Sequence, residues 1–386
     1  MAEPATHKER HGEGELHRLL DIPELEIATG EVAIPEAERA EIEAESLSIA
    51  RPVEDISEDR AWLSHRLLNV RTIFSFVLAI GIVVFIFTKL NIDPLTTWNT
   101  MLTANPLLLV TAFVVYYSAF WLRAARWKLL LNNVEYDKET VRLPGVNGLV
   151  EIIYLSWFVN CIVPAKLGDA YRSYLLKRNA GIAFSSTIGT ILAERVIDLL
   201  ILFGLLTVSF TLIGKHFSEA RGFDLNLVMV FGAVMVIGLI AALGGLRFFG
   251  HLIVRVVPHR YQEKFTSFRH GILRSFHRRS MPKLAGYTVL IWLLEGGRLF
   301  FVTRSLDAHQ VTLSAVIFIA LLSSLVTTIP ATPGGAGLVE GAVALSLGLF
   351  LTDQHLAVSI ALLDRLINYW SLVVGGLVLY LISRRK

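Results

Sequence analysis

Residues 327–340 read TTIPATPGGAGLVE and interrupt an apolar stretch that runs from about 313 to 351. Proline removes a backbone donor and glycine readily adopts positive φ, so this composition predicts a sharp break between two helices. The break contains Pro330, Pro333, Gly334, Gly335 and Gly337. A helix that restarts here would direct free backbone N–H groups towards an anion, although Glu340 in its first turn competes for them. The alternative is a purely structural turn that binds no ligand.

A second irregular apolar stretch, about 146–165, ends in the sequence NCIVPAKLGD at residues 160–169. Pro164 interrupts the helical hydrogen bonds and Gly168 permits a tight turn, so backbone polar groups are released where only protein or water can satisfy them. The polar and charged side chains around this break are Asn160, Lys166, Asp169 and Arg172. The two cations among them either contact a lipid phosphate or anchor the helix ends at the membrane surface.

The whole chain has the composition of an integral membrane protein. Of its 386 residues, 54% are hydrophobic and 18% are charged, and the mean hydropathy is +0.56; a typical soluble domain is about 25% charged. Six runs approach the roughly 20 apolar residues that cross a bilayer. They are residues 69–89, 106–122, 186–213, 225–246, 284–303 and 356–382. The single cysteine, Cys161, excludes an internal disulfide.

The net charge of +3 combines two segments of opposite sign. Residues 1–65 hold six Lys/Arg and 17 Asp/Glu, a balance of −11, whereas residues 66–386 hold 30 and 16, a balance of +14. With little apolar surface to bury, the first segment is predicted to be a mostly disordered cytoplasmic tail, either a solvated extension or a docking site for a cytosolic partner. It has no basic start followed by an apolar run, as a signal peptide would. The transmembrane domain is expected at 66–386.

Positive residues assign the loops to the two sides of the membrane, because short cytoplasmic loops are enriched in Lys and Arg. Basic clusters precede the first span, flank the 146–165 stretch on both sides, fill 247–283 and end the chain. The cluster after the second span comprises Arg123, Arg126, Lys128, Lys138 and Arg142. Both ends of 146–165 are thus predicted to be cytoplasmic, and both ends of 313–351, which are sparse in positive charge, external.

The sequence therefore predicts an all-α polytopic protein of the cell membrane with six full transmembrane helices, two opposed re-entrant helical hairpins and both termini cytoplasmic. Opposed, interrupted segments are typical of inverted-repeat transporters with a site near the midplane. In the basic segment 260–279, Phe265, Phe268 and Ile272 recur at helical spacing, which favours an amphipathic helix on the anionic leaflet. An ordinary positive loop would explain the charge but not the apolar spacing.

Three predicted spans carry ionisable residues, which are costly in lipid and usually face a partner or a wet cavity. These polar positions are Glu194, Arg195 and Asp198 in the third span, Glu295 and Arg298 in the fifth, and Asp364, Arg365 and Asn368 in the last. Two interpretations stay open. The charges pair across helices, for example Glu295 with Arg195, and only fix the bundle, or they line a polar path; a gating ion pair would do both.

Together these motifs resemble the lysylphosphatidylglycerol synthase transmembrane family, also called flippase-like, over about residues 66–386. The resemblance rests on Asn160, Pro164, Gly168-Asp169, Arg172, Glu194-Arg195, Asp198, Pro330, Thr332 to Gly335, Gly337, Glu340, Arg365 and Tyr369-Trp370. It implies a lipid-translocating membrane domain. The chain differs from the aminoacyl-lipid synthases in lacking a soluble aminoacyl-transferase segment, so we do not expect it to make aminoacylated lipid. Lys166 stands where the family has arginine, which loses bidentate phosphate recognition.

The sequence thus predicts a flippase or lipid transporter that moves a polar or anionic lipid between leaflets through a cavity formed by the two hairpins. The lipid classes left open are phospholipids, aminoacyl-lipids, isoprenoids and glycolipids, and a separate enzyme would supply any modified lipid. The sequence has no G-x-x-x-x-G-K-[ST] motif and no metal-ligand cluster, so we expect no catalytic residues, metal, cofactor or nucleic-acid partner. The alternatives are a membrane-embedded transferase acting on lipid-linked sugars and a non-transporting scaffold.

Overall fold

The computed structural model of the protein describes residues 70–89, 91–134, 136, 142–163, 167–221, 258–328 and 332–385, with isolated positions between 230 and 254. The acidic segment 1–65, most of the predicted span 225–246, Lys166 and Pro330 lie outside the described residues. The chain divides into two units, residues 1–62 and 63–386, and all of the described residues belong to the second.

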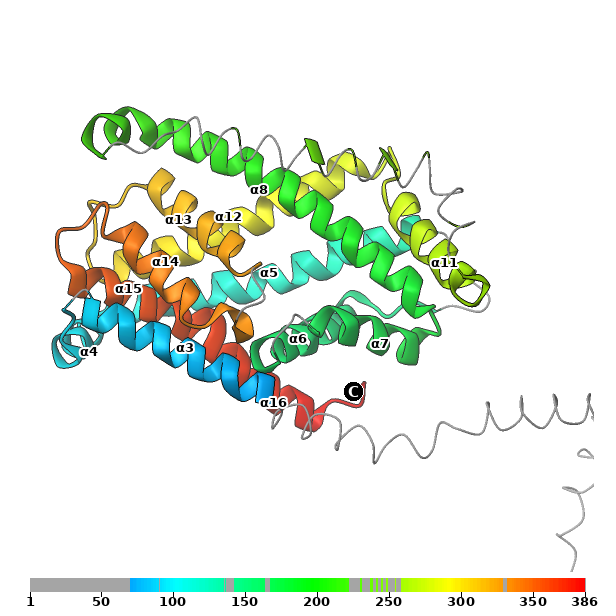
Figure 1. Cartoon of the computed structure of the whole chain (residues 1–386), viewed down its shortest axis with the longest axis horizontal. Coiled ribbons are helices and arrows are strands. Elements are labelled where there is room, and N and C mark those ends of the chain that lie inside the picture. Colours follow the sequence, from blue (N-terminus) through cyan, green and yellow to red (C-terminus); the bar gives the residue numbers. More distant parts are fainter. Residues whose placement is uncertain are drawn as a thin grey trace, which may run out of the picture. The chain divides into compact units, whose positions relative to one another are not determined.

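The described part of the second unit is built from helices and contains no strand (Figure 1). Its helices are α3 Val70–Lys89, α4 Pro94–Leu102, α5 Pro106–Asn133, α6 Val146–Ile162, α7 Gly168–Ala180, α8 Phe184–Arg221, α11 His259–Ser275, α12 Met281–Ser305, α13 Leu313–Val326, α14 Leu338–Leu347, α15 Gln354–Arg365 and α16 Ser371–Ile382. A 3₁₀ turn, η2 Pro333–Gly335, precedes α14, and a π turn, η3 Leu366–Trp370, joins α15 to α16. The predicted all-helical, multi-pass architecture is confirmed.

Four helices are long and apolar enough to cross a membrane: Pro106–Asn133, Phe184–Ile213, Met281–Ser305 and Gln354–Ile382. The helices Val77–Lys89 and Pro94–Leu102 are bent by 95° relative to each other and together would make a fifth span. By length and composition, the described residues therefore contain four or five candidate spans. The count of six stays a prediction, because the expected span 225–246 falls mostly outside these residues.

Helix α5 corrects the predicted end of the second span at residue 122. Asn105 caps its start by accepting hydrogen bonds from the backbone N–H groups of Leu107 and Leu108, and the helix continues to Asn133. Arg123 and Arg126 are therefore buried inside the helix bundle rather than part of a cytoplasmic loop. They stay in the helix because carboxylates on α8 and α12 neutralise their charge.

Helices α6 and α7 pack against each other as a hairpin. The Ser156 hydroxyl donates to the Gly168 carbonyl at 2.8 Å, and the Gly168 N–H donates to Asn160 Oδ1 at 2.8 Å. A Cβ atom on Gly168 would lie 2.0 Å from the Ser156 carbonyl oxygen. The first predicted break is thus confirmed as a helix–break–helix element, and Gly168 is required because the two backbones approach so closely.

The second break joins α13 to α14, which also pack against each other. Gly334, Gly335 and Gly337 have φ of 55°, 72° and 82°, a left-handed region that strongly favours glycine. The break between helices that the TPGGAG sequence predicts is confirmed.

The two breaks meet in the bundle. α6 packs against η2, and Tyr369 of the π turn donates its hydroxyl to the Cys161 carbonyl at 3.0 Å. A Cβ atom on Gly334 would lie 2.6 Å from the Tyr369 ring and 3.4 Å from Cys161 Cα. Short π turns of this kind occur frequently at functional sites. In this one the Asn368 carbonyl accepts a hydrogen bond from the Tyr116 hydroxyl at 2.9 Å.

The predicted amphipathic segment 260–279 overlaps α11, which packs against the first turns of α8. The contact is tight: a Cβ atom on Gly189 would lie 2.4 Å from the Phe268 carbonyl oxygen, and one on Gly271 2.3 Å from the Ser186 carbonyl oxygen. The helix is thereby fixed to the start of α8. Its position on the membrane surface stays a prediction.

Candidate functional site

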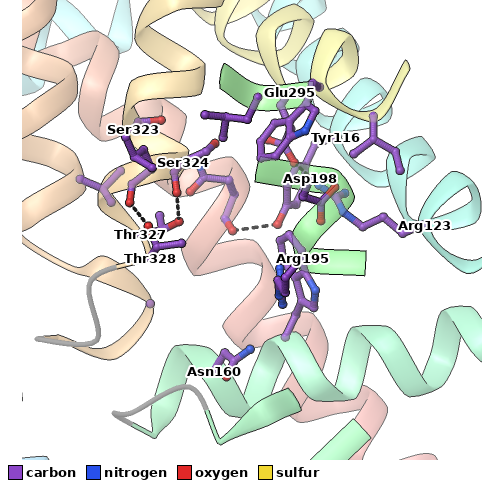
Figure 2. A pocket seen from close by; sticks show the side chains of 18 of the residues that line it. Tyr116, Arg123, Asn160, Arg195, Asp198, Glu295, Ser323, Ser324, Thr327 and Thr328 are labelled. Atoms are coloured by element: carbon purple, nitrogen blue, oxygen red, sulfur yellow. Dashed lines mark hydrogen bonds and ion pairs between the residues drawn. The ribbon is translucent and has the colours of Figure 1, made fainter. Parts of the chain in front are cut away.

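A cavity of about 450 Å³ opens where the two breaks meet the charged helices (Figure 2). Helices α5, α6, α7, α8, α12, α13, α14 and α15 and the turns η2 and η3 contribute to its lining. The predicted site residues in the lining are Asn160, Asp169, Glu194, Arg195, Asp198, Glu295, Arg298, Gly334 and Arg365. The structure thus brings together predicted positions from both broken elements and from all three charged spans.

Of the remaining predicted residues, Lys166 and Pro330 lie outside the described residues, and the others contact the lining or form the η2 turn. Arg172, Glu340 and Asp364 are ion-paired to residues that line the cavity. Pro333 and Gly335 form the η2 turn with Gly334 and are buried.

Arg126 and Glu194 form the centre of a buried network between α5, α7 and α8. Arg126 contacts Glu194 Oε1 at 2.9 Å and both carboxylate oxygens of Asp198, and it donates to Thr288 Oγ1 at 2.8 Å. Arg172 contacts the other Glu194 oxygen at 3.0 Å. Because Glu194 and Asp198 are four residues apart on one helix face, a single guanidinium can hold both.

A second buried network joins α5, α12 and α15. Glu295 accepts from Arg123 at 2.6 Å and lies 3.4 Å from Arg298 Nη2 through its other oxygen. Arg298 pairs with Asp364, whose second carboxylate oxygen accepts from Asn368 Nδ2 at 2.8 Å. This network links the fifth predicted span to the last one and closes one wall of the cavity.

Arg365 connects the π turn to the second break. It donates to Glu340 Oε1 at 3.0 Å, to the Gly334 carbonyl at 3.1 Å and to Asn368 Oδ1 at 3.2 Å. The second Glu340 oxygen accepts from the Gly337 N–H at 2.7 Å. Glu340 thus accepts a hydrogen bond from a backbone N–H group at the start of α14. It would compete with an anion for that group, as the sequence predicts.

Arg195 is the most exposed of the arginines that line the cavity. It pairs with Asp169 at 3.0 Å, and 38% of its side chain and 24% of the Asp169 side chain are exposed, whereas the other lining arginines are at most 7% exposed. The predicted pairing of Glu295 with Arg195 is wrong. Glu295 lies between Arg123 and Arg298, which leaves Arg195 to face the cavity with Asp169 from α7.

Aromatic rings hold several of these arginines in place. The guanidinium of Arg172 lies 3.7 Å from the Trp127 ring centroid, that of Arg365 4.4 Å from Tyr369 and that of Arg123 4.5 Å from Trp157. Contact with an aromatic face stabilises a cation without using its N–H donors.

The opposite wall carries hydroxyl groups at the end of α13. These hydroxyls belong to Ser323, Ser324, Thr327 and Thr328. Figure 2 shows them on one side of the cavity and Arg195, Asp198 and Glu295 on the other. Ser323 and Ser324 donate to the Ala320 carbonyl, Thr327 to that of Ser324, and Thr328 to that of Leu325. Each hydroxyl proton is therefore used within the helix, which leaves oxygen lone pairs as acceptors.

Sequence reasoning missed several lining residues. Arg123 and Arg126 were assigned to a loop, although the apolar run on both sides of them signals one long helix. The hydroxyls of 323–328 carry no charge and were overlooked, but four of six residues there are Ser or Thr. Among the described residues, no group of three or more His, Cys, Asp or Glu side chains is placed to hold a metal ion.

Comparison with known proteins agrees with this architecture. A UPF0104 membrane protein of Methanocaldococcus jannaschii is 34% identical over 233 residues, which cover 59% of this chain and 95% of that protein. Another, from Pyrococcus horikoshii, is 22% identical over 75% of this chain and 91% of its own length. Glycosyltransferase AglD of Haloferax volcanii is 26% identical over 82% of this chain, but the match spans only 54% of that protein.

The family match covers most of the chain and every element around the cavity. Residues 72–376 match the family described as the lysylphosphatidylglycerol synthase TM region. They include both helix breaks, the charged helices α5, α8, α12 and α15, and the π turn. The protein is therefore an integral, multi-pass membrane protein that belongs to the lysylphosphatidylglycerol synthase transmembrane-region family.

Proposed function

We propose that the protein is a transporter rather than an enzyme, and that it moves a lipid with a polar or anionic head group between the leaflets of the membrane. The observation that carries this proposal is the cavity of about 450 Å³, which is lined by ionised side chains inside a bundle of membrane-crossing helices. Its volume falls in the range of about 300–1,000 Å³ that is typical of small-ligand sites. The head group would occupy the cavity while its hydrocarbon chains stay in lipid.

The placement of the charges supports this assignment. Ionised residues within membrane spans usually face one another or a wet cavity. Here the buried pairs account for most of them, but Arg195 and Asp169 remain partly exposed to the cavity. A partly exposed ion pair beside two helix breaks is the arrangement expected of a polar path that a head group can enter.

We further propose that both broken elements are re-entrant, as the sequence predicts. The test uses single cysteines on a Cys161→Ala background at exposed loop positions on both sides of each element. Gly145→Cys and Ala183→Cys should both react with an impermeant maleimide from the cytoplasmic side, and Gln310→Cys and Thr352→Cys both from the external side. Labelling of either pair from opposite sides would show a full crossing.

Substitution of the exposed arginine tests the transport proposal. Purified protein is reconstituted into vesicles with labelled lipids, and the accessible fraction of label is followed with an impermeant quencher. Arg195→Ala should slow lipid movement roughly tenfold or more, because hydrogen bonds to charged groups contribute about 1.5–3 kcal/mol.

The matched control is Arg385→Ala. Arg385 pairs with Glu151 at 3.1 Å with similar exposure, 36% and 26%, but does not line the cavity. This variant should move lipid at the wild-type rate. Movement that is equal in protein-free vesicles would reject the transporter, and equal slowing by both substitutions would reject the role of the cavity.

The similarity to AglD favours one second candidate, a transferase that acts on a lipid-linked sugar. That protein is named a glycosyltransferase, and about half of its length matches this chain. The same cavity would then hold the lipid-linked acceptor. Turnover of a polyprenyl-phosphate sugar by the purified protein, lost in Arg195→Ala, would favour this candidate over transport.

A further inference from the structure

The carboxylates that line the cavity are already occupied. Glu194 uses its two oxygens on Arg126 and Arg172, and Glu295 uses its two on Arg123 and Arg298. Asp198 binds Arg126 through both oxygens, and Asp169 binds Arg195 through both. An arginine thus already neutralises each carboxylate of the described lining, so a cationic head group would meet no unpaired negative charge there.

The arginines, in contrast, retain unused donors. Arg123 Nη1, Arg126 Nε and Arg298 Nε are buried and have no hydrogen-bond partner among the described residues. Five arginines and four carboxylates line the cavity, and with their ion-paired neighbours Arg172, Glu340 and Asp364 the positive and negative charges balance at six each. A guanidinium N–H matches a phosphate oxygen in geometry and charge. The three unpartnered donors are buried, so a phosphate on this wall would first contact Arg195, whose side chain is 38% exposed.

The hydroxyl wall adds a second requirement. The hydroxyls of Ser323, Ser324, Thr327 and Thr328 donate to their own helix, so towards the cavity they present acceptors. Acceptors repel a phosphate oxygen but bind the O–H groups of a polyol. The two walls therefore match two different parts of one head group.

We propose that this site, if the protein transports lipid as inferred above, selects a head group that combines a phosphate with several hydroxyls, and discriminates against a cationic aminoacyl head group. The phosphate lies against the arginine wall, nearest the exposed Arg195. The polyol or sugar lies against the α13 hydroxyls. A phosphoinositol or phosphoglycerol lipid and a polyprenyl-phosphate sugar share this chemistry. The experiment below distinguishes between them.

Two readouts are measured on the full chain. The first is binding, as the rise in melting temperature of the detergent-solubilised protein with each lipid; the second is movement of the same labelled lipid in vesicles. The lipids are phosphatidylinositol, polyprenyl-phosphate glucose, phosphatidylcholine and lysylphosphatidylglycerol. We expect one of the first two to bind and move roughly tenfold better than the last two, which corresponds to about 1.4 kcal/mol.

The hydroxyl wall is tested with the double substitution Ser324→Ala and Thr327→Val. A typical hydrogen bond contributes about 0.5–1.5 kcal/mol, so loss of two should reduce the preference for the hydroxylated lipid over phosphatidylcholine by about fivefold or more. The matched control is Thr111→Val with Ser118→Ala. These hydroxyls also donate to carbonyls of their own helix, α5, but do not line the cavity, so the preference should stay unchanged.

The outcomes separate the two proposals. Preferred binding of a hydroxylated anionic lipid without movement would reject transport but support the selectivity. If lysylphosphatidylglycerol binds and moves as well as the hydroxylated anionic lipids or better, transport would be supported and the selectivity overturned. A preference that survives the double substitution in a protein with an unchanged melting temperature would overturn the role of the hydroxyl wall.

Discussion

Glu194→Ala should lower the free energy of unfolding by about 3–5 kcal/mol, the range found when one partner of a buried ion pair is removed. Glu194 is 4% exposed and holds Arg126 and Arg172, both of which are about 1% exposed. Arg126 would keep Asp198, but Arg172 would lose the carboxylate that it contacts and keep the Trp127 ring. The expected loss therefore comes mainly from a buried charge without a counterion. Unfolding by SDS in mixed micelles, followed by tryptophan fluorescence, measures it.

The comparison variant is Glu151→Ala. Glu151 also accepts two hydrogen bonds, from Arg385 and Ser383, but its side chain is 26% exposed. Exposed pairs contribute about 0–1 kcal/mol, so this change should be small. If the two variants differ by less than about 1 kcal/mol, Glu194 is not the structural centre of its network, and any loss of transport in Glu194→Ala would then reflect a role in the lipid path.

Gly168→Ala should destabilise the first hairpin by about 3 kcal/mol, at the upper end of the usual effect of overpacking. The added Cβ would lie 2.0 Å from the Ser156 carbonyl oxygen and 2.6 Å from Asn160 Cγ. Rotation of a side chain cannot relieve a contact with backbone, so α6 and α7 would have to separate. That movement would also break the hydrogen bonds of Gly168 with Ser156 and Asn160, and shift Asp169 away from Arg195. Lipid movement should fall together with stability.

The control is another helical glycine. Gly204 of α8 is exposed, and a Cβ atom there would have no atom within 4 Å. Gly204→Ala should leave stability unchanged or raise it by up to about 1 kcal/mol, because alanine is the better helix former. Opposite signs for the two substitutions would attribute the effect to the hairpin contact. A stable, active Gly168→Ala protein would contradict the close packing of α6 on α7.

Local sequence was sufficient to predict the helix breaks. At 330–337 and at 164–168, proline and glycine change what the backbone itself can adopt, so no partner is needed to infer a break. The long apolar runs similarly predicted α5, α8, α12 and the α15–α16 helix. The end of α5 was misplaced, because a charge in an apolar run looks like the edge of a span until its partner is known.

The pairing of the charges was decided by the tertiary structure. The sequence identified Glu194, Glu295 and Asp364 as residues that need partners, because an isolated charge in lipid is unstable. It could not identify those partners, since Arg123 is 172 residues from Glu295 and Arg126 is 68 residues from Glu194. Only the packing of α5 against α8 and α12 brings the atoms within contact distance and turns these residues into buried networks.

By itself, then, the sequence determined a multi-pass helical membrane protein with two broken elements and several charged spans, because hydropathy and backbone preference act over a few residues. The tertiary structure alone decided which charges neutralise one another, that Arg195 and Asp169 remain partly exposed, and that the α13 hydroxyls face them across one cavity. The physical reason is that ion pairing and exposure depend on distances between helices that are far apart in the chain.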